Sequence, residues 1–128
     1  MKKRILATIL CVCIVIGAVG ATTAQARWTN TSSISLDMSL SSGTMSSEGT
    51  VFGKAGTTMI EVTFTLEKLV SGKYSPVDSW QASSYSMFVG SNRYTSSCTS
   101  GTYKLSISGT VTKDGYAEPI EDWLIKSF

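Results

Sequence analysis

The sequence of 128 residues contains no histidine, and this absence excludes a large part of enzyme chemistry. Zinc and copper sites depend on histidine and cysteine ligands, and a Ser–His–Asp triad needs a histidine as its general base. A catalytic cysteine would lack the same base. Residues 53–58 (GKAGTT) lack the spacing of a phosphate-binding loop. The carboxylates are scattered rather than paired as a glycosidase requires. We therefore expect a non-enzymatic protein without catalytic, cofactor-binding or metal-binding residues.

Long apolar runs are also scarce, because the chain has one, at its beginning. A basic head, Met1 to Arg4, precedes an uncharged run over residues 5–21, and Ala24-Gln25-Ala26 places small residues where signal peptidase reads. This pattern predicts a secretory signal peptide over residues 1–26 and an extracellular domain over residues 27–128. The alternative is a retained membrane anchor, although a run of seventeen residues is shorter than a typical membrane span.

Cysteine is rare, and two of the three cysteines lie in the predicted signal peptide. The remaining one, Cys98, cannot form a disulfide within the secreted domain. It either forms an intermolecular disulfide with another chain or stays a free thiol near a turn. About a hundred residues suffice for a folded core without disulfides.

Charge of either sign is also sparse. Residues 27–128 carry 8 basic and 9 acidic residues, a net charge of −1. No basic patch suggests nucleic acid, and no second apolar run suggests a membrane after signal cleavage.

Alternating apolar and polar residues dominate the secreted part. In residues 58–68, Ile60, Val62 and Phe64 share one parity, which places them on one face of a strand and not on one face of a helix. Short strands at this spacing predict one all-β domain, an antiparallel sandwich of about seven strands. The predicted strands cover residues 33–41, 44–53, 58–69, 74–82, 85–95, 102–112 and 117–126.

Glycine and proline refine this prediction. Asp114-Gly115 is a two-residue hairpin signature, because both residues tolerate the positive φ of a type I′ turn. Pro76 and Pro119 cannot donate to a strand ladder, so they predict edge strands. Gly109, inside a predicted strand, indicates a bulge or a close approach of another group.

Residues 100–105 (SGTYKL) resemble the tyrosine corner of immunoglobulin-like sandwiches. The resemblance implies that Tyr103 returns its hydroxyl to nearby backbone, that Gly101 permits the tight approach, and that Leu105 stands where antibody domains carry a cysteine. The alternative is a hairpin tyrosine that packs on its neighbours. Residues 53–68, 77–80 and 100–112 together resemble small secreted sandwich proteins of Gram-positive bacteria. That resemblance implies an extracellular, immunoglobulin-like fold.

Aromatic side chains exceed what the predicted core faces need. Residues 85–94 combine Tyr85, Phe88 and Tyr94 with the hydrogen-bonding side chains of Asn92 and Arg93. Exposed aromatic rings are suited to stack on the C–H face of a sugar, so these five residues are the predicted ligand-binding set. The alternative is that most aromatic residues close the two ends of the core.

Two further motifs give expectations that a structure can test. Asp114, Glu118, Glu121 and Asp122 cluster in the sequence and form either a weak calcium site or a solvated hairpin. Asn30-Thr31-Ser32 matches the acceptor sequence for N-glycosylation.

The expected function is non-catalytic recognition of another protein or of a surface polysaccharide. A secreted effector or antimicrobial that acts on other cells is an alternative. A structural component that assembles through strand edges or through Cys98 is another.

Overall fold

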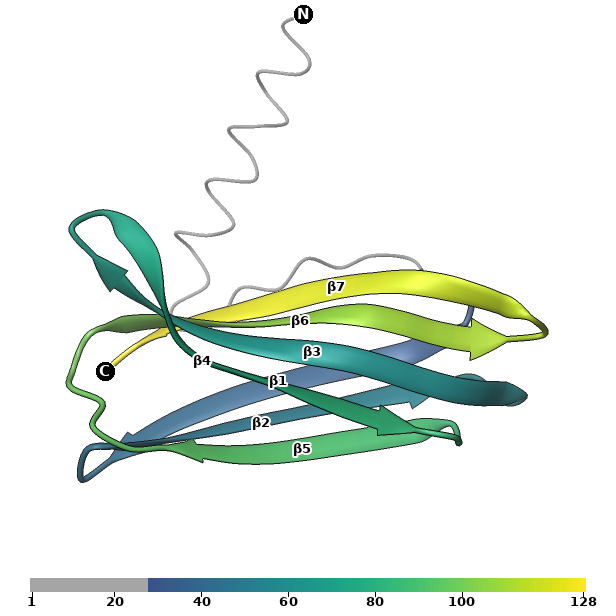
Figure 1. The fold of residues 1–128 in the computed structure, drawn as a ribbon, viewed down its shortest axis with the longest axis horizontal. Coiled ribbons are helices and arrows are strands. Elements are labelled where there is room, and N and C mark those ends of the chain that lie inside the picture. Colours follow the sequence, from purple (N-terminus) through teal and green to yellow (C-terminus); the bar gives the residue numbers. More distant parts are fainter. Residues whose placement is uncertain (1–27) are drawn as a thin grey trace, which may run out of the picture.

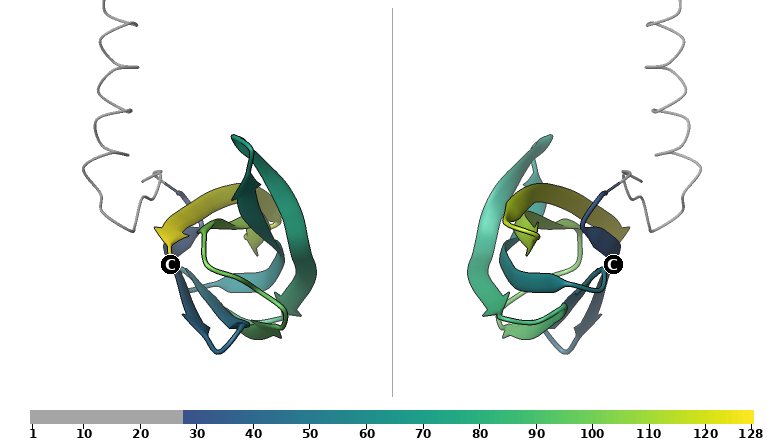
Figure 2. Two further views of the ribbon diagram at one scale, coloured as in Figure 1. Left: turned by 90° about the vertical axis from the view of Figure 1, so that its left-hand side faces the viewer. Right: turned by 90° about the vertical axis from the view of Figure 1, so that its right-hand side faces the viewer.

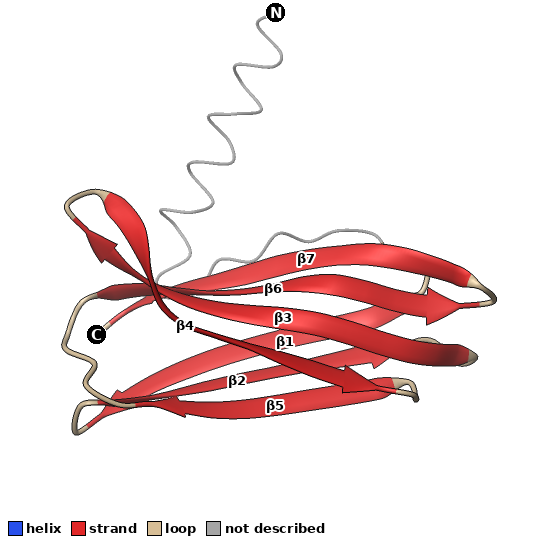
Figure 3. Cartoon of the chain, viewed as in Figure 1, coloured by secondary structure: helices blue, strands red, loops and turns tan. Residues whose placement is uncertain are grey.

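The computed structural model describes residues 28–128, and every regular element in this range is an antiparallel β-strand (Figures 1 and 3). The predicted signal peptide, with its cleavage point after Ala26, lies outside the described residues. No helix with the length and hydropathy of a membrane span occurs in residues 28–128. The strands are β1 (Thr31–Ser41), β2 (Thr44–Gly53), β3 (Thr57–Val70), β4 (Lys73–Ser84), β5 (Phe88–Thr95), β6 (Thr102–Lys113) and β7 (Tyr116–Ser127).

The strands form two sheets that pack face to face, as the views in Figure 2 show. The smaller sheet has the order β1-β2-β5, and the larger has the order β4-β3-β6-β7. Three hairpins join neighbours within a sheet, and the chain crosses between sheets after β2, β4 and β5. The prediction of an all-β chain with seven antiparallel strands is confirmed.

The core lies between the sheets and follows the predicted alternation. Full burial of an aliphatic or aromatic side chain contributes about 1.5–3 kcal/mol, so this core is the main source of stability. The inward residues are Met38, Met45, Val51 and Val89 from the smaller sheet and Ile60, Val62, Phe64, Leu66, Tyr103, Leu105, Ile107, Val111, Ile120 and Leu124 from the larger sheet.

The turns and edges agree with the glycine and proline signals. Asp114 and Gly115 have φ values of 53° and 78°, as a type I′ hairpin requires. Pro76 lies on β4 and Pro119 on β7, the two outer strands of the larger sheet, so both edge predictions are confirmed.

Gly109 allows β6 to approach β3 closely. A Cβ atom at this position would lie 2.0 Å from the carbonyl oxygen of Glu61 and 2.7 Å from the Cα of Val62. No side chain fits there without moving backbone, so the close approach explains the glycine.

The prediction for the fifth strand is wrong at its start. β5 begins at Phe88, and Tyr85, Ser86 and Met87 form a bend instead. These three residues carry the chain from β4 in one sheet to β5 in the other, and of their backbone groups the Met87 carbonyl oxygen accepts a hydrogen bond from the Gly53 N–H of β2 at 2.8 Å. The Ser86 hydroxyl accepts a hydrogen bond from the Phe88 N–H (3.3 Å) and holds the bend.

Tyr103 and Cys98 close one end of the sandwich. The buried Tyr103 hydroxyl donates to the carbonyl oxygen of Thr99 at 2.7 Å, four residues upstream, which is the contact a tyrosine corner makes. Burial raises the pKa of Tyr103, and the neighbouring Cys98 adds to this effect. Gly101 exchanges two backbone hydrogen bonds with Phe128, at 3.1 and 2.8 Å.

Candidate functional site

The predicted ligand-binding residues divide between two sides of β5. Phe88, Asn92 and Tyr94 alternate along the strand on its outer side. The register places them opposite Phe52, Glu48 and Ser46 of β2, in that order. We call this surface the β5 face, defined by Ser46, Glu48, Thr50, Phe52, Phe88, Gly90, Asn92 and Tyr94.

Aromatic rings occupy both ends of the β5 face. The rings of Phe52 and Phe88 pack with their centroids 4.8 Å apart, yet the two residues remain 45% and 44% exposed. Tyr94, six residues along the strand, is 66% exposed. A rise of about 3.4 Å per residue separates the two aromatic positions by about 20 Å. The face therefore offers two contact points with a polar stretch between them.

That polar stretch consists of hydrogen-bonding side chains. Asn92 donates from its amide nitrogen to the Tyr94 hydroxyl at 3.3 Å, and its amide oxygen accepts from the Ser46 hydroxyl at 3.4 Å. Glu48 lies opposite Asn92 and is exposed. These groups lie on the outer side of the smaller sheet, where a ligand's hydroxyl groups can reach them.

Arg93 does not belong to the β5 face, because its parity places it on the other side of β5 from Asn92 and Tyr94. Its guanidinium donates to both carboxylate oxygens of Asp78 on β4, at 3.0 and 3.1 Å. Asp78 also accepts from the Thr95 hydroxyl at 2.8 Å. Arg93 lies 5.4 Å from the Trp80 ring, and the Trp80 indole donates to Ser91 at 2.9 Å. These side chains connect β4, at the edge of the larger sheet, to β5, at the edge of the smaller sheet.

This ion pair shifts the pKa of both partners. The hydrogen bonds from Arg93 are the largest cause that holds the pKa of Asp78 below its ordinary value, against the opposing effect of burial. The Asp78 carboxylate in turn raises the pKa of Arg93. Arg93 therefore links β5 to β4 and lies on the opposite side of β5 from Asn92.

Tyr85 is 84% exposed in the bend before β5 and is not on the strand with Tyr94. Its position is at the Phe88 end of the β5 face. Phe52 and Glu48, in contrast, belong to the face but were absent from the predicted set. Alternation along β2 gives their outward direction, but only the pairing of β2 with β5 brings them beside Phe88 and Asn92.

The four clustered acids do not form a calcium site. Asp114 lies in the β6–β7 turn and pairs with Lys113 at 3.6 Å, while Glu121 is exposed on the outer side of β7. Glu118 and Asp122 are buried on the inner side. Within residues 28–128 no group of three or more acidic, cysteine or histidine residues could hold a metal ion. The solvated-hairpin alternative is also wrong for the two buried acids.

Glu118 instead holds the first described residues against β7. Its carboxylate accepts hydrogen bonds from the Thr29 N–H, from the Asn30 N–H at 2.8 Å and from the Thr31 hydroxyl at 3.2 Å. Burial acts to raise the pKa of Glu118, but these hydrogen bonds outweigh it and lower the pKa. We call this arrangement the Glu118 clamp.

The glycosylation motif falls inside the same clamp. The Asn30 side chain is buried, and its amide nitrogen donates to the carbonyl oxygens of Val111 at 2.8 Å and Tyr116 at 2.9 Å. Both amide hydrogens are thus engaged, so the folded domain offers no glycosylation acceptor at Asn30.

Cys98 is 5% exposed, and its thiol lies 3.4 Å from the carbonyl oxygen of Thr95. Its backbone N–H donates to the Gly43 carbonyl at 2.8 Å. An intermolecular disulfide at Cys98 would require the loop between β5 and β6 to open.

Comparisons of the sequence and the fold with protein-family models, with curated proteins and with solved structures find no match.

Proposed function

We propose that this protein is a secreted, non-catalytic binding domain that recognises a surface polysaccharide through the β5 face. The observation that carries the proposal is the exposed aromatic pair Phe52–Phe88 on the same face as exposed Tyr94, with hydrogen-bonding Asn92 and Glu48 between them. Aromatic rings stack on the C–H faces of sugars, and the polar groups between them bind hydroxyls.

A polysaccharide suits this face better than a protein does. The fully buried centre of a protein–protein interface is depleted of charged residues and rich in apolar ones. Here the order is reversed, because Glu48, Asn92 and Thr50 occupy the middle and the aromatic residues lie at the ends. An extended glycan can contact both ends and still leave the central polar groups hydrogen-bonded.

The proposed fold is of the immunoglobulin type. Strands β1, β2 and β5 correspond to strands A, B and E of that fold, and β3, β6 and β7 correspond to C, F and G. β4 lies beside β3, in the position of strand C′. The Tyr103 hydroxyl, bonded to Thr99 from the strand that corresponds to F, supports the same assignment.

Secretion is proposed on the sequence of residues 1–26, with its basic head, apolar run and Ala24-Gln25-Ala26. Mass spectrometry of the protein recovered from the growth medium tests this directly. A chain that begins at Arg27 agrees with the proposal, whereas a chain that keeps residues 1–26 in the membrane fraction contradicts it.

Co-sedimentation of the purified protein with bacterial cell walls, cellulose and chitin tests the ligand class. We expect retention on one of these materials, competed by its soluble fragments. Tyr94→Ala and Phe88→Ala should each weaken retention about tenfold, which corresponds to about 1.4 kcal/mol of binding free energy.

The matched control is Tyr116→Ala, since Tyr116 is also an exposed tyrosine but lies at the start of β7. It should bind as the unaltered protein does. Failure on all three materials, or retention that Tyr94→Ala leaves unchanged, overturns the role of the β5 face and turns attention to a protein partner.

A further inference from the structure

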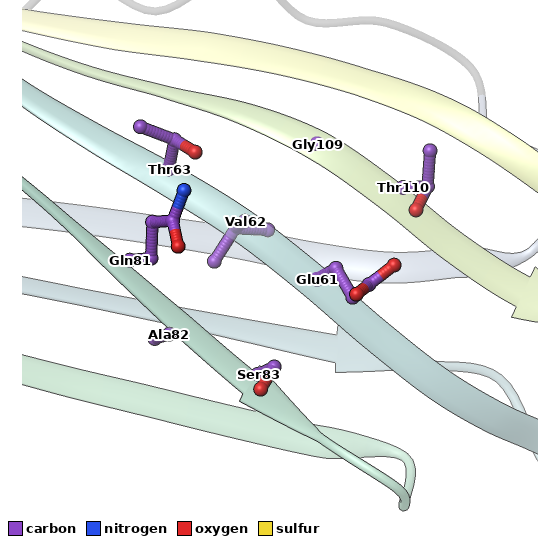
Figure 4. A pocket seen from close by; sticks show the side chains of 8 residues that line it. All are labelled: Glu61, Val62, Thr63, Gln81, Ala82, Ser83, Gly109 and Thr110. Carbon is purple, nitrogen blue, oxygen red and sulfur yellow. The ribbon is translucent and has the colours of Figure 1, made fainter.

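A second surface with ligand-binding chemistry lies on the outer side of the larger sheet. One hollow there, of about 570 Å³, is lined by polar side chains from neighbouring strands, as Figure 4 shows for Glu61 and Thr63 of β3, Gln81 and Ser83 of β4, and Thr110 of β6. Another, of about 560 Å³, is lined by Trp28, Ser108, Pro119, Glu121 and Trp123.

The two hollows meet at Gly109, which lines both of them. Gly109 lies on β6, between β3 and β7 in the strand order of the larger sheet. Together the hollows run across the strands, from two indole rings at one end to hydroxyl, amide and carboxylate groups at the other. We call this surface the tryptophan groove.

We propose that the tryptophan groove is a second binding site, for a neutral glycan chain. Each hollow is open to solvent and combines apolar atoms with a few polar groups, as ligand sites do. In this site Trp123, together with the part of Trp28 that is not packed against the core, contacts the apolar face of one sugar. Gln81, Thr63 and Glu61 supply hydrogen bonds for the sugars that follow.

Charge decides between a neutral glycan and other ligands. The exposed carboxylates of Glu61 and Glu121 repel an anionic chain. A cationic ligand meets Lys104, whose Nζ lies 5.7 Å from the Trp123 ring and 5.6 Å from the Tyr74 ring. That lysine already makes the cation–π contact that an ammonium ligand would seek.

The groove and the β5 face belong to different sheets and face opposite sides of the sandwich. This inference rests on the proposed function for the class of ligand, but on none of the residues of the β5 face. A domain with both sites holds two glycan chains at once, and linked sites raise the effective concentration for the second contact.

The test uses the indole N–H resonances of the protein's three tryptophans, titrated with cellohexaose, chitohexaose, laminarihexaose and mannohexaose. Trp80 is an internal control, because its indole is bonded to Ser91 and its ring stacks on Phe64 at 5.5 Å. We expect one hexasaccharide to shift the Trp28 and Trp123 resonances saturably while the Trp80 resonance stays in place. If none of the four sugars shifts both resonances up to about 10 mM, the site is absent. Equal shifts of all three tryptophans contradict it too.

Variants separate the two surfaces. Tyr94→Ala should leave the indole shifts unchanged, whereas Trp123→Ala should abolish the shift of Trp28. Gln81→Ala, a change on an exposed edge strand, should weaken the affinity about threefold to tenfold without loss of folding. If Gln81→Ala binds as the unaltered protein does, the groove does not extend past Gly109 and the proposal is wrong. Loss of retention on insoluble polysaccharide in Tyr94→Ala tests the β5 face independently of these shifts.

Discussion

The Glu118 clamp gives the sharpest prediction about stability. In Glu118→Gln the side chain keeps its shape, but its NH2 group cannot accept the hydrogen bond that the carboxylate takes from the Thr29 N–H. The remaining bonds, from Asn30 and Thr31, lose the charge of their acceptor. A hydrogen bond to a charged group contributes about 1.5–3 kcal/mol and a neutral one about 0.5–1.5 kcal/mol. We expect the variant to lose about 2–3 kcal/mol, or about 10–20 °C in Tm for a domain of this size.

The loss should depend on pH in a defined direction. The hydrogen bonds hold the pKa of Glu118 below its ordinary value in the folded protein, whereas in the unfolded chain the pKa is about 4.3. A group whose folded pKa is depressed contributes its full stability above the unfolded pKa, and this contribution is lost as pH falls through the folded pKa. The difference between the unaltered protein and Glu118→Gln should therefore be largest near neutral pH and should shrink below about pH 4.

Thermal and urea unfolding, followed by circular dichroism at about pH 7 and about pH 3, measures both effects. The control is Glu121→Gln, because Glu121 lies on the same strand but is exposed on its outer side. Equal destabilisation by the two substitutions would refute the clamp as the cause. A difference in stability that stays constant between the two pH values would refute the linkage argument.

Three other substitutions or modifications test the remaining contacts. Tyr103→Phe removes the bond to a buried carbonyl and should cost about 1–3 kcal/mol in urea unfolding; an effect no larger than that of Tyr116→Phe contradicts this. Arg93→Ala should lower the Tm and make the Tm less sensitive to acid, while the protein is still retained on polysaccharide. Loss of retention with an unchanged Tm would show instead that Arg93 binds the ligand. The Cys98 thiol should react slowly with a thiol reagent in the native protein and rapidly in guanidinium chloride. A disulfide-linked dimer on a non-reducing gel would show that the loop between β5 and β6, which holds Cys98, opens.

The strands were predictable because their signal is local. Ile60, Val62 and Phe64 share a parity that only an extended chain can place on one face, and the structure buries all three. Parity also carries a signal for the buried acids of β7. Glu118 and Asp122 share the parity of Ile120, so alternation along β7 already indicated that both acids point inward.

The candidate site was less predictable because it depends on pairing between distant strands. Phe52 joins Phe88 through the β2–β5 register, which no local pattern specifies. Arg93 has inward parity, but β5 is an edge strand, so its inner side opens toward β4 and the guanidinium reaches Asp78. Adjacency in the sequence suggested that Arg93 acts with Asn92 and Tyr94, whereas successive residues of a strand point to opposite sides.

The exposed aromatic residues can be weighed against the alternative that they only complete the core. Trp80 does so, because it stacks on Phe64 and donates to Ser91. Tyr103 does so as well, at the other end of the sandwich. Tyr94 makes no such contribution, since two thirds of it stays exposed and, within residues 28–128, its hydroxyl bonds to the exposed Asn92 alone. Exposed apolar surface on a monomer, when it gathers on one face, marks a contact site. The core therefore does not account for the exposed aromatic residues of the β5 face, and this is the reason for the ligand that we propose there.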